Sequence, residues 1–201
     1  MIYRFMYTAF CDGTTDVTDL RHPSVTHLCV TAHKNQIFLY IEATEPSVDP
    51  AAIVAGKFKA FPDGSNFFRM AEVFHYSKPF SEEHWKRKDL NKKPWVRINY
   101  LKPEMTSSYF FYHYQYQEEN PGMVDKYGIL FLYGNLLVLY MEYPFEEETL
   151  SYKGSLDTHN TPVGKEAWDD MIEQHFIPWE DDAINNDPNG PWLPITVLIN
   201  K

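Results

Sequence analysis

The chain has 201 residues, of which 44% are hydrophobic and 16% aromatic. This composition is typical of a globular protein, either one large domain or two small ones, and it excludes an intrinsically disordered chain. The formal net charge is −10, from 28 acidic and 18 basic residues. This acidic balance argues against nucleic acid as a partner, because binding to phosphates needs a basic surface.

The two cysteines, Cys11 and Cys29, are too few for a disulfide-rich secreted scaffold and favour buried thiols in a reducing compartment. Residues 1–10 lack the long apolar run of a signal peptide. No window approaches the roughly 20 consecutive apolar residues that a membrane helix requires. We therefore expect a soluble, cytoplasmic protein that has no membrane partner.

The first half of the chain predicts a sheet with one clear helix. Aromatic and β-branched content predicts four strands, over residues 2–10, 25–32, 36–43 and 66–76. A helix is predicted over 48–61, because Asp49-Pro50 suits a helix N-terminus and Ile53, Val54, Phe58 and Phe61 form one apolar stripe. The polar segment 14–24 leaves room for one or two helical turns. The charged segment 79–94 breaks the pattern and is expected to connect two halves.

The second half predicts a strand over 96–101 and then an aromatic-rich helix. In that helix Met105, Tyr109, His113 and Tyr116 recur at helical spacing and share one face. Asn120-Pro121-Gly122 ends the helix. Further elements are predicted in the order strand 126–133, strand 136–143, a polar loop over 144–164, helix 163–176 and strand 192–199.

The predicted order is β-α-β-β-α-β twice, although the first helix of the first repeat is poorly defined. Such a unit folds as an antiparallel four-stranded sheet with two helices on one face, the ferredoxin-like arrangement. We therefore expect an α+β protein in which two ferredoxin-like repeats form a single-chain, pseudo-dimeric α/β barrel. Its parts are an N-terminal half, residues 1–78, a connector, 79–94, and a C-terminal half, 95–201.

Tyr109 and His113 lie one helical turn apart and can therefore face the same pocket. An imidazole with a pKa of roughly 6.5 exchanges a proton near neutral pH, and a phenol donates one. The alternative is a histidine that is simply part of an aromatic core. The other histidines and the acidic clusters show no spacing typical of a metal site, so no metal is expected.

Several short motifs occur in a consistent order over residues 95–199. They are Lys102-Pro103-Glu104, Tyr109-x-x-x-His113, Glu119, Lys126-Tyr127-Gly128-Ile129, Glu142, Ala167-Trp168-Asp169-Asp170-Met171 and the closing strand 193–198. Together they resemble the L-rhamnose mutarotase family. That family has about half this length and forms its α/β barrel by pairing two chains, so a homodimer and a single-chain pseudo-dimer both remain open here.

The resemblance implies an isomerase that interconverts the α and β anomers of a reducing sugar or deoxysugar such as L-rhamnose, without a cofactor. Tyr109 and His113 would then be the proton donor and acceptor. Trp168 would stack on the sugar, and Tyr127 and Glu119 would bind its hydroxyl groups. The alternative is an α/β-barrel protein that binds a small ligand or haem, or a cofactor-independent monooxygenase-like protein, because fold alone does not choose among these functions.

Overall fold

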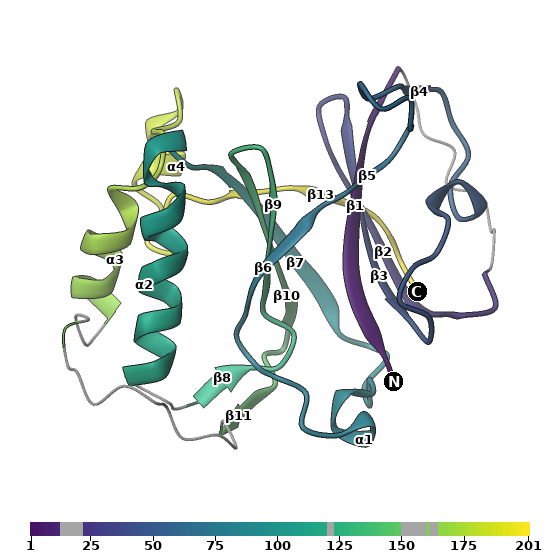
Figure 1. Ribbon diagram of the computed structural model, residues 1–201. Coiled ribbons are helices and arrows are strands. Elements are labelled where there is room, and N and C mark those ends of the chain that lie inside the picture. The colour runs from purple at the N-terminus through teal and green to yellow at the C-terminus, as the bar shows by residue number, and fades with distance from the viewer. Residues whose placement is uncertain (13–21, 120–122, 150–159, 161–164) are drawn as a thin grey trace. The chain divides into compact units, whose positions relative to one another are not determined.

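The structure is a computed structural model of the 201-residue chain, and it describes residues 1–12, 22–119, 123–149, 160 and 165–201 (Figure 1). The chain forms two compact units, which are described separately. Unit 1 comprises Met1–Glu72, Pro79–Val96 and Ile195–Lys201, and unit 2 comprises Val73–Lys78 and Arg97–Pro194. The predicted turn at 120–122 and most of the predicted loop over 144–164 lie outside the described residues.

Unit 1 contains a six-stranded antiparallel sheet in the order β13-β2-β3-β1-β4, in which β5 also pairs with β1. Its strands are β1 (Tyr3–Cys11), β2 (Val25–His33), β3 (Gln36–Ala43), β4 (Phe58–Lys59), β5 (Phe68–Arg69) and β13 (Thr196–Asn200). The strands predicted over 2–10, 25–32 and 36–43 are confirmed. The hairpin between β2 and β3 turns at Lys34, which has a left-handed φ of 54°.

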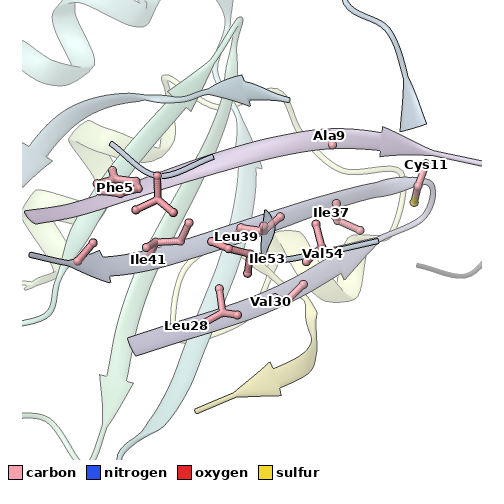
Figure 2. Packing of buried hydrophobic residues seen from close by; sticks show 12 residues of the cluster. Phe5, Ala9, Cys11, Leu28, Val30, Ile37, Leu39, Ile41, Ile53 and Val54 are labelled. Atoms are coloured by element: carbon pink, nitrogen blue, oxygen red, sulfur yellow. The ribbon is translucent and has the colours of Figure 1, made fainter. Parts of the chain in front are cut away.

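The apolar core of unit 1 lies on one face of this sheet. Alternate residues of β3 point toward that face, as the two-residue period of a strand requires. Figure 2 shows the cluster, which contains Phe5, Ala9, Cys11, Leu28, Val30, Ile37, Leu39, Ile41, Ala43, Val48, Ile53 and Val54. Cys11 and Cys29 are both buried and not disulfide-bonded.

The prediction of a helix over residues 48–61 is wrong. Only one 3₁₀ turn, η1 (Pro50–Ala52), forms there, and its N-terminus is capped by Asp49. Ile53 and Val54 enter the core as predicted, but they do so from an irregular segment. Phe58 then pairs with Cys11 as part of β4. Pairing with β1 therefore overrides a helical pattern that glycine and β-branched residues already weaken.

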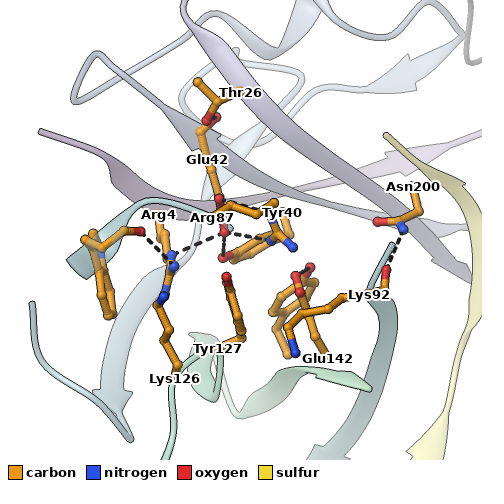
Figure 3. A network of polar contacts seen from close by, with 12 residues as sticks. Arg4, Thr26, Tyr40, Glu42, Arg87, Lys92, Lys126, Tyr127, Glu142 and Asn200 are labelled. Atoms are coloured by element: carbon orange, nitrogen blue, oxygen red, sulfur yellow. Dashed lines mark hydrogen bonds and ion pairs between the residues drawn. The ribbon is translucent and has the colours of Figure 1, made fainter. Parts of the chain in front are cut away.

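The other face of β3 carries a buried polar network in unit 1 (Figure 3). Glu42 is 0% exposed, and its Oε1 accepts hydrogen bonds from Arg87 Nη2 at 2.8 Å and from the Tyr40 hydroxyl at 2.9 Å. Arg4 Nε lies 3.2 Å from the same oxygen. Burial alone raises the pKa of Glu42, but Arg4 and Arg87 outweigh it and hold that pKa below its usual value. Glu42 is thus the ionised centre of this network.

The segment predicted to connect two halves is part of unit 1. It contains α1 (Glu82–Trp85), whose first turn is capped by Ser81. The Arg4 guanidinium lies 3.7 Å from the centre of the Trp85 ring and donates a hydrogen bond to the Trp85 carbonyl oxygen. This segment is therefore packed on the sheet of unit 1 by a cation–π contact and a hydrogen bond.

Unit 2 contains most of the sheet β12-β7-β10-β9-β6, in which β6 and β7 begin with residues of unit 1, and a separate antiparallel pair, β8 and β11. The strands are β6 (Ala71–His75), β7 (Lys93–Tyr100), β8 (Met123–Asp125), β9 (Ile129–Tyr133), β10 (Leu136–Tyr143), β11 (Glu147–Thr149) and β12 (Leu193–Pro194). The predicted hairpin is confirmed, with β9 and β10 joined at Gly134, whose φ is 59°.

Two helices of unit 2 lie side by side on one face of its sheet (Figure 1). The predicted aromatic-rich helix is confirmed as α2 (Thr106–Glu119), which follows the 3₁₀ turn η2 (Pro103–Met105). The second predicted helix is α3 (Lys165–Glu173), and a short helix, α4 (Asp182–Asn185), follows it. None of the described helices is both long enough and apolar enough to cross a bilayer.

Both sheets repeat one strand order, as the predicted duplication requires. In unit 1 the order is β2-β3-β1, and β4 and β5 follow beside β1. In unit 2 the corresponding order is β9-β10-β7, and β12 follows beside β7. The hydrogen bonds repeat as well. The Cys11 amide donates to the Asn35 carbonyl at 2.8 Å, and the Leu101 amide donates to the Asn135 carbonyl at 2.9 Å. The α+β class is therefore confirmed, together with a repeat of strand order.

The two units exchange strands, which the sequence did not predict. The strand expected over 66–76 divides at Met70, so that β5 lies in unit 1 and β6 pairs with β9 of the other sheet. The last expected strand divides in the same way at Ile195, and β13 pairs with β2. Consequently residues 73–78 belong to unit 2, and residues 79–96 and 195–201 belong to unit 1, which differs from the expected boundaries at 78 and 94.

Candidate functional site

Tyr109 and His113 both point from α2 toward the sheet of unit 2. They are 1% and 5% exposed, and their ring centroids lie 4.3 Å apart. Tyr109 belongs to the apolar cluster that contains Leu130, Leu137 and Leu139 of the sheet. The predicted common face of these two residues is therefore confirmed.

The surroundings of His113 fix its protonation. Nδ1 lies 2.8 Å from the backbone carbonyl oxygen of Tyr109. Since a carbonyl oxygen only accepts hydrogen bonds, Nδ1 carries a hydrogen. Burial, with a smaller contribution from His175, lowers the pKa of His113 to about 4, although this hydrogen bond acts in the opposite direction. At neutral pH the ring is thus uncharged, and its Nε2 is a proton acceptor.

Tyr109 supplies the complementary group. Burial raises the pKa of its phenol well above the usual value, the nearby Tyr76 phenol raises it further, and Arg97 opposes both effects. At neutral pH the Tyr109 hydroxyl therefore keeps its proton. Within the described residues, neither this hydroxyl nor His113 Nε2 has a hydrogen-bond partner. Buried polar groups rarely lack partners, so this pair is open to a ligand.

A cavity of about 130 Å³ lies beside the pair, and we call it the His113 pocket. Its lining includes Tyr76, Arg97, Tyr109, His113, Trp168 and Trp192. Asp169 and Glu173 of α3 also line it, and both are partly or fully exposed, which places acidic side chains near solvent. A small ligand in this pocket would meet aromatic rings and groups that donate and accept protons.

Two residues that sequence reasoning missed contribute to the pocket. Arg97 of β7 is 7% exposed, and burial lowers its pKa to about 10, so the guanidinium stays charged at neutral pH. Tyr76 follows β6, and its hydroxyl has no hydrogen-bond partner within the described residues. Arg97 could have been found from the sequence, because it is a charged residue in an otherwise largely apolar predicted strand. Nothing in the local sequence indicates Tyr76, because strand exchange brings it to this sheet.

The structure brings together three of the five predicted site residues. Trp168 of α3 lines the pocket, and its ring centroid lies 5.1 Å from that of His113. Tyr127 is fully buried outside the pocket lining, and its backbone amide donates to Asp125 Oδ1 at 2.7 Å. Glu119 lies at the end of α2, where it accepts a hydrogen bond from Gln115 at 2.8 Å.

The described residues were also compared with the ligand sets of metal sites. Within residues 1–12, 22–119, 123–149, 160 and 165–201, no group of three or more His, Cys, Asp or Glu side chains is placed to hold a metal ion. The side chains that line the His113 pocket can transfer protons and stabilise charge. No family model, curated protein or solved structure matches this chain.

Proposed function

We propose that the chain is a mutarotase-type isomerase that interconverts the anomers of a small reducing sugar. One observation carries this proposal. The hydroxyl of Tyr109 and Nε2 of His113 both lack partners within the described residues, and both residues line the same cavity. Anomer exchange needs this combination, because one proton must leave the anomeric hydroxyl while another reaches the ring oxygen.

In the proposed reaction, His113 Nε2 accepts the proton of the anomeric hydroxyl and the Tyr109 hydroxyl donates its proton to the ring oxygen. The bond between the anomeric carbon and the ring oxygen breaks, which gives the open-chain aldehyde. Rotation about the adjacent carbon–carbon bond exposes the other face of the carbonyl group. The reverse proton transfers then close the ring and restore both side chains.

Two further features support the proposal. Trp168 lies beside His113 and offers the flat apolar surface on which a sugar ring stacks. The repeated strand order supports our proposal of two related repeats in a single-chain α/β barrel. The two helices of a ferredoxin-like repeat lie on the sheet of unit 2 (Figure 1), whereas in unit 1 the helix expected over 48–61 is replaced by one 3₁₀ turn. An α/β barrel is the fold which the resemblance to L-rhamnose mutarotases implies.

The size of the pocket limits the ligand. Its volume of about 130 Å³ is close to the roughly 150 Å³ of an engineered protein cavity that binds benzene. A single sugar ring nearly fills a cavity of this volume, and its substituents would extend toward Asp169 and Glu173. A porphyrin, with four pyrrole rings, exceeds this volume, so the size favours a sugar over the haem alternative.

The test is saturation-transfer NMR of anomer exchange over a panel that includes L-rhamnose, L-fucose and D-xylose. We expect exchange faster than in buffer for at least one sugar, and a decrease of about 10²–10⁴-fold in Tyr109→Phe and His113→Gln. Tyr112→Phe is the matched control, because it removes a hydroxyl from the same helix outside the pocket lining. Exchange no faster than in buffer for every sugar would overturn the proposal, as would unchanged exchange in both pocket variants.

A further inference from the structure

The position of Arg97 is set by the alternation of β7. Arg97 and Leu101 are an even number of residues apart and face the same side of the sheet. Leu101 packs in the cluster that contains Tyr109, so this side is the one that α2 covers. Arg97 Nη1 donates a hydrogen bond to the Asn189 carbonyl oxygen at 3.2 Å, and both residues line the His113 pocket.

The sheet itself does not require a charge at this position. The internal repeat provides the comparison. The Met70 amide donates to the Met6 carbonyl oxygen at 2.9 Å, and the Ile195 amide donates to the Val96 carbonyl oxygen at 3.0 Å, so Met6 and Val96 occupy equivalent positions in the two repeats. The residue after Met6 is Tyr7, which packs against the apolar cluster of unit 1. The residue after Val96 is Arg97. An uncharged ring therefore fills this position in one repeat, whereas the other repeat buries a guanidinium, which costs desolvation free energy.

The charges around Arg97 connect it to the pocket chemistry. Tyr76 and Tyr109 both interact electrostatically with the guanidinium, as does Asp187. Arg97 in turn lowers the pKa of the Tyr109 phenol, against the effect of burial. His113 is uncharged at neutral pH, and the carboxylates of α3, Asp169 and Glu173, lie nearer to solvent. Among the described residues that line the pocket, Arg97 is thus the one with a positive charge.

We propose that Arg97 binds the ligand oxygen that gains negative charge when His113 removes its proton. This inference rests on the proposed function and adds a third working residue to the pair of proton-transfer groups. A guanidinium that is already in place stabilises developing charge without reorganisation, and its burial strengthens that interaction. The same geometry makes small hydroxycarboxylates ligands of the pocket, because their carboxylate carries this charge permanently.

The first test measures anomer exchange in Arg97 variants. We expect Arg97→Met to lower the exchange rate by about 10²–10³-fold and Arg97→Lys to restore part of it. Arg69→Met is the matched control, because Arg69 is an exposed arginine of unit 1 whose Nη1 donates to the Pro46 carbonyl oxygen. An Arg97→Met enzyme with the exchange rate of the wild type would overturn the inference.

The second test does not need activity. Glycolate and glycolamide have nearly the same shape but differ in charge, and their binding can be followed by NMR of the tryptophan side chains. We expect wild-type protein to bind glycolate at least tenfold more tightly than glycolamide, and Arg97→Met to lose this preference. The absence of a preference in the wild-type protein overturns the inference, whether or not the variant folds.

The two tests separate the two proposals. If the wild-type protein exchanges no sugar but prefers glycolate through Arg97, the mutarotase proposal fails and the anion site stands. If exchange occurs and Arg97→Met changes neither exchange nor glycolate binding, only the role of Arg97 fails. Partial rescue by Arg97→Lys distinguishes a role of the charge from a role in packing, since methionine replaces the length of the side chain but not its charge.

Discussion

The ring of Tyr76 packs directly on the backbone of Gly128. A Cβ atom on Gly128 would lie 2.7 Å from Cδ2 and 3.0 Å from Cγ of that ring, and the Tyr76 amide donates to the Gly128 carbonyl oxygen at 3.0 Å. Because the close atoms include the base of the ring, the whole side chain would have to move to make room. Tyr76 lines the His113 pocket, so the absence of a side chain at Gly128 leaves room for a ring of the pocket wall.

We therefore predict that Gly128→Ala lowers the free energy of unfolding by about 1–3 kcal/mol, the usual cost of adding a methyl group to a filled site. Urea denaturation measures this change. The control is the same substitution in a Tyr76→Ala background, where the ring that clashes is absent and most of the penalty should disappear. An equal penalty in both backgrounds would show that Gly128 is needed for another reason.

A second prediction concerns the buried network of unit 1. Glu42→Gln removes the negative charge that faces Arg4 and Arg87 but keeps the shape of the side chain. Because two largely buried guanidinium groups lose their counter-ion, we expect the free energy of unfolding at pH 7 to fall by about 3–5 kcal/mol. Glu45→Gln, at an exposed site close by, should change it by less than about 0.5 kcal/mol.

The pH dependence gives this prediction a second check. The folded-state pKa of Glu42 lies below its usual value, so the stability that its charge contributes is present at neutral pH and is lost as the pH falls through the acidic range. The difference between wild-type protein and Glu42→Gln should shrink accordingly. A difference that stays constant down to pH 3 would contradict the assigned ion pairs.

Local patterns predicted the parts of the site that one element determines. Tyr109 and His113 face one pocket because helical spacing alone places them together, and the hairpin of β9 and β10 follows from Gly134-Asn135. Trp168 was predicted from the resemblance, and it lies in the pocket. Tyr127 and Glu119 lie outside the pocket lining, because motif order along the chain carries no information about distance across the fold.

The parts that depend on distant pairing could not be predicted. The strand breaks at Met70 and Ile195 leave the apolar pattern of each segment unchanged, yet they send its second part to the other sheet. Tyr76 reaches the pocket through this exchange. The failure of the helix over 48–61 has the same origin, since Phe58 gains a partner in β1 that its local sequence does not indicate.

The third prediction is the tautomer of His113. The carbonyl oxygen of Tyr109 fixes the hydrogen on Nδ1 and leaves Nε2 unprotonated, as the proposed proton acceptor must be. Long-range ¹H–¹⁵N correlation spectra at pH 7 should therefore show the Nδ1–H form for this ring. Assignment is made by comparison with His113→Gln, which lacks the signal. A dominant Nε2–H form would remove the proton acceptor from the proposed mechanism.

The last prediction is the effect of His113 on stability at acid pH. Its pKa is about 4 in the folded protein and about 6.5 in an unfolded chain. Between these values the unfolded state binds more protons, so stability falls as the pH is lowered from 6.5 to 4. The loss contributed by this one group should reach about 3 kcal/mol at pH 4 and below.

The variant His113→Gln isolates this contribution, because glutamine does not titrate and all other groups are shared. We expect the free energy of unfolding of wild-type protein, relative to the variant, to be constant above pH 7 and to decrease by about 3 kcal/mol between pH 7 and pH 4. Urea denaturation at several pH values measures it. A flat difference would mean that His113 is accessible to water and ionises normally, and a ring in that state could not be the buried proton acceptor that anomer exchange in this pocket requires.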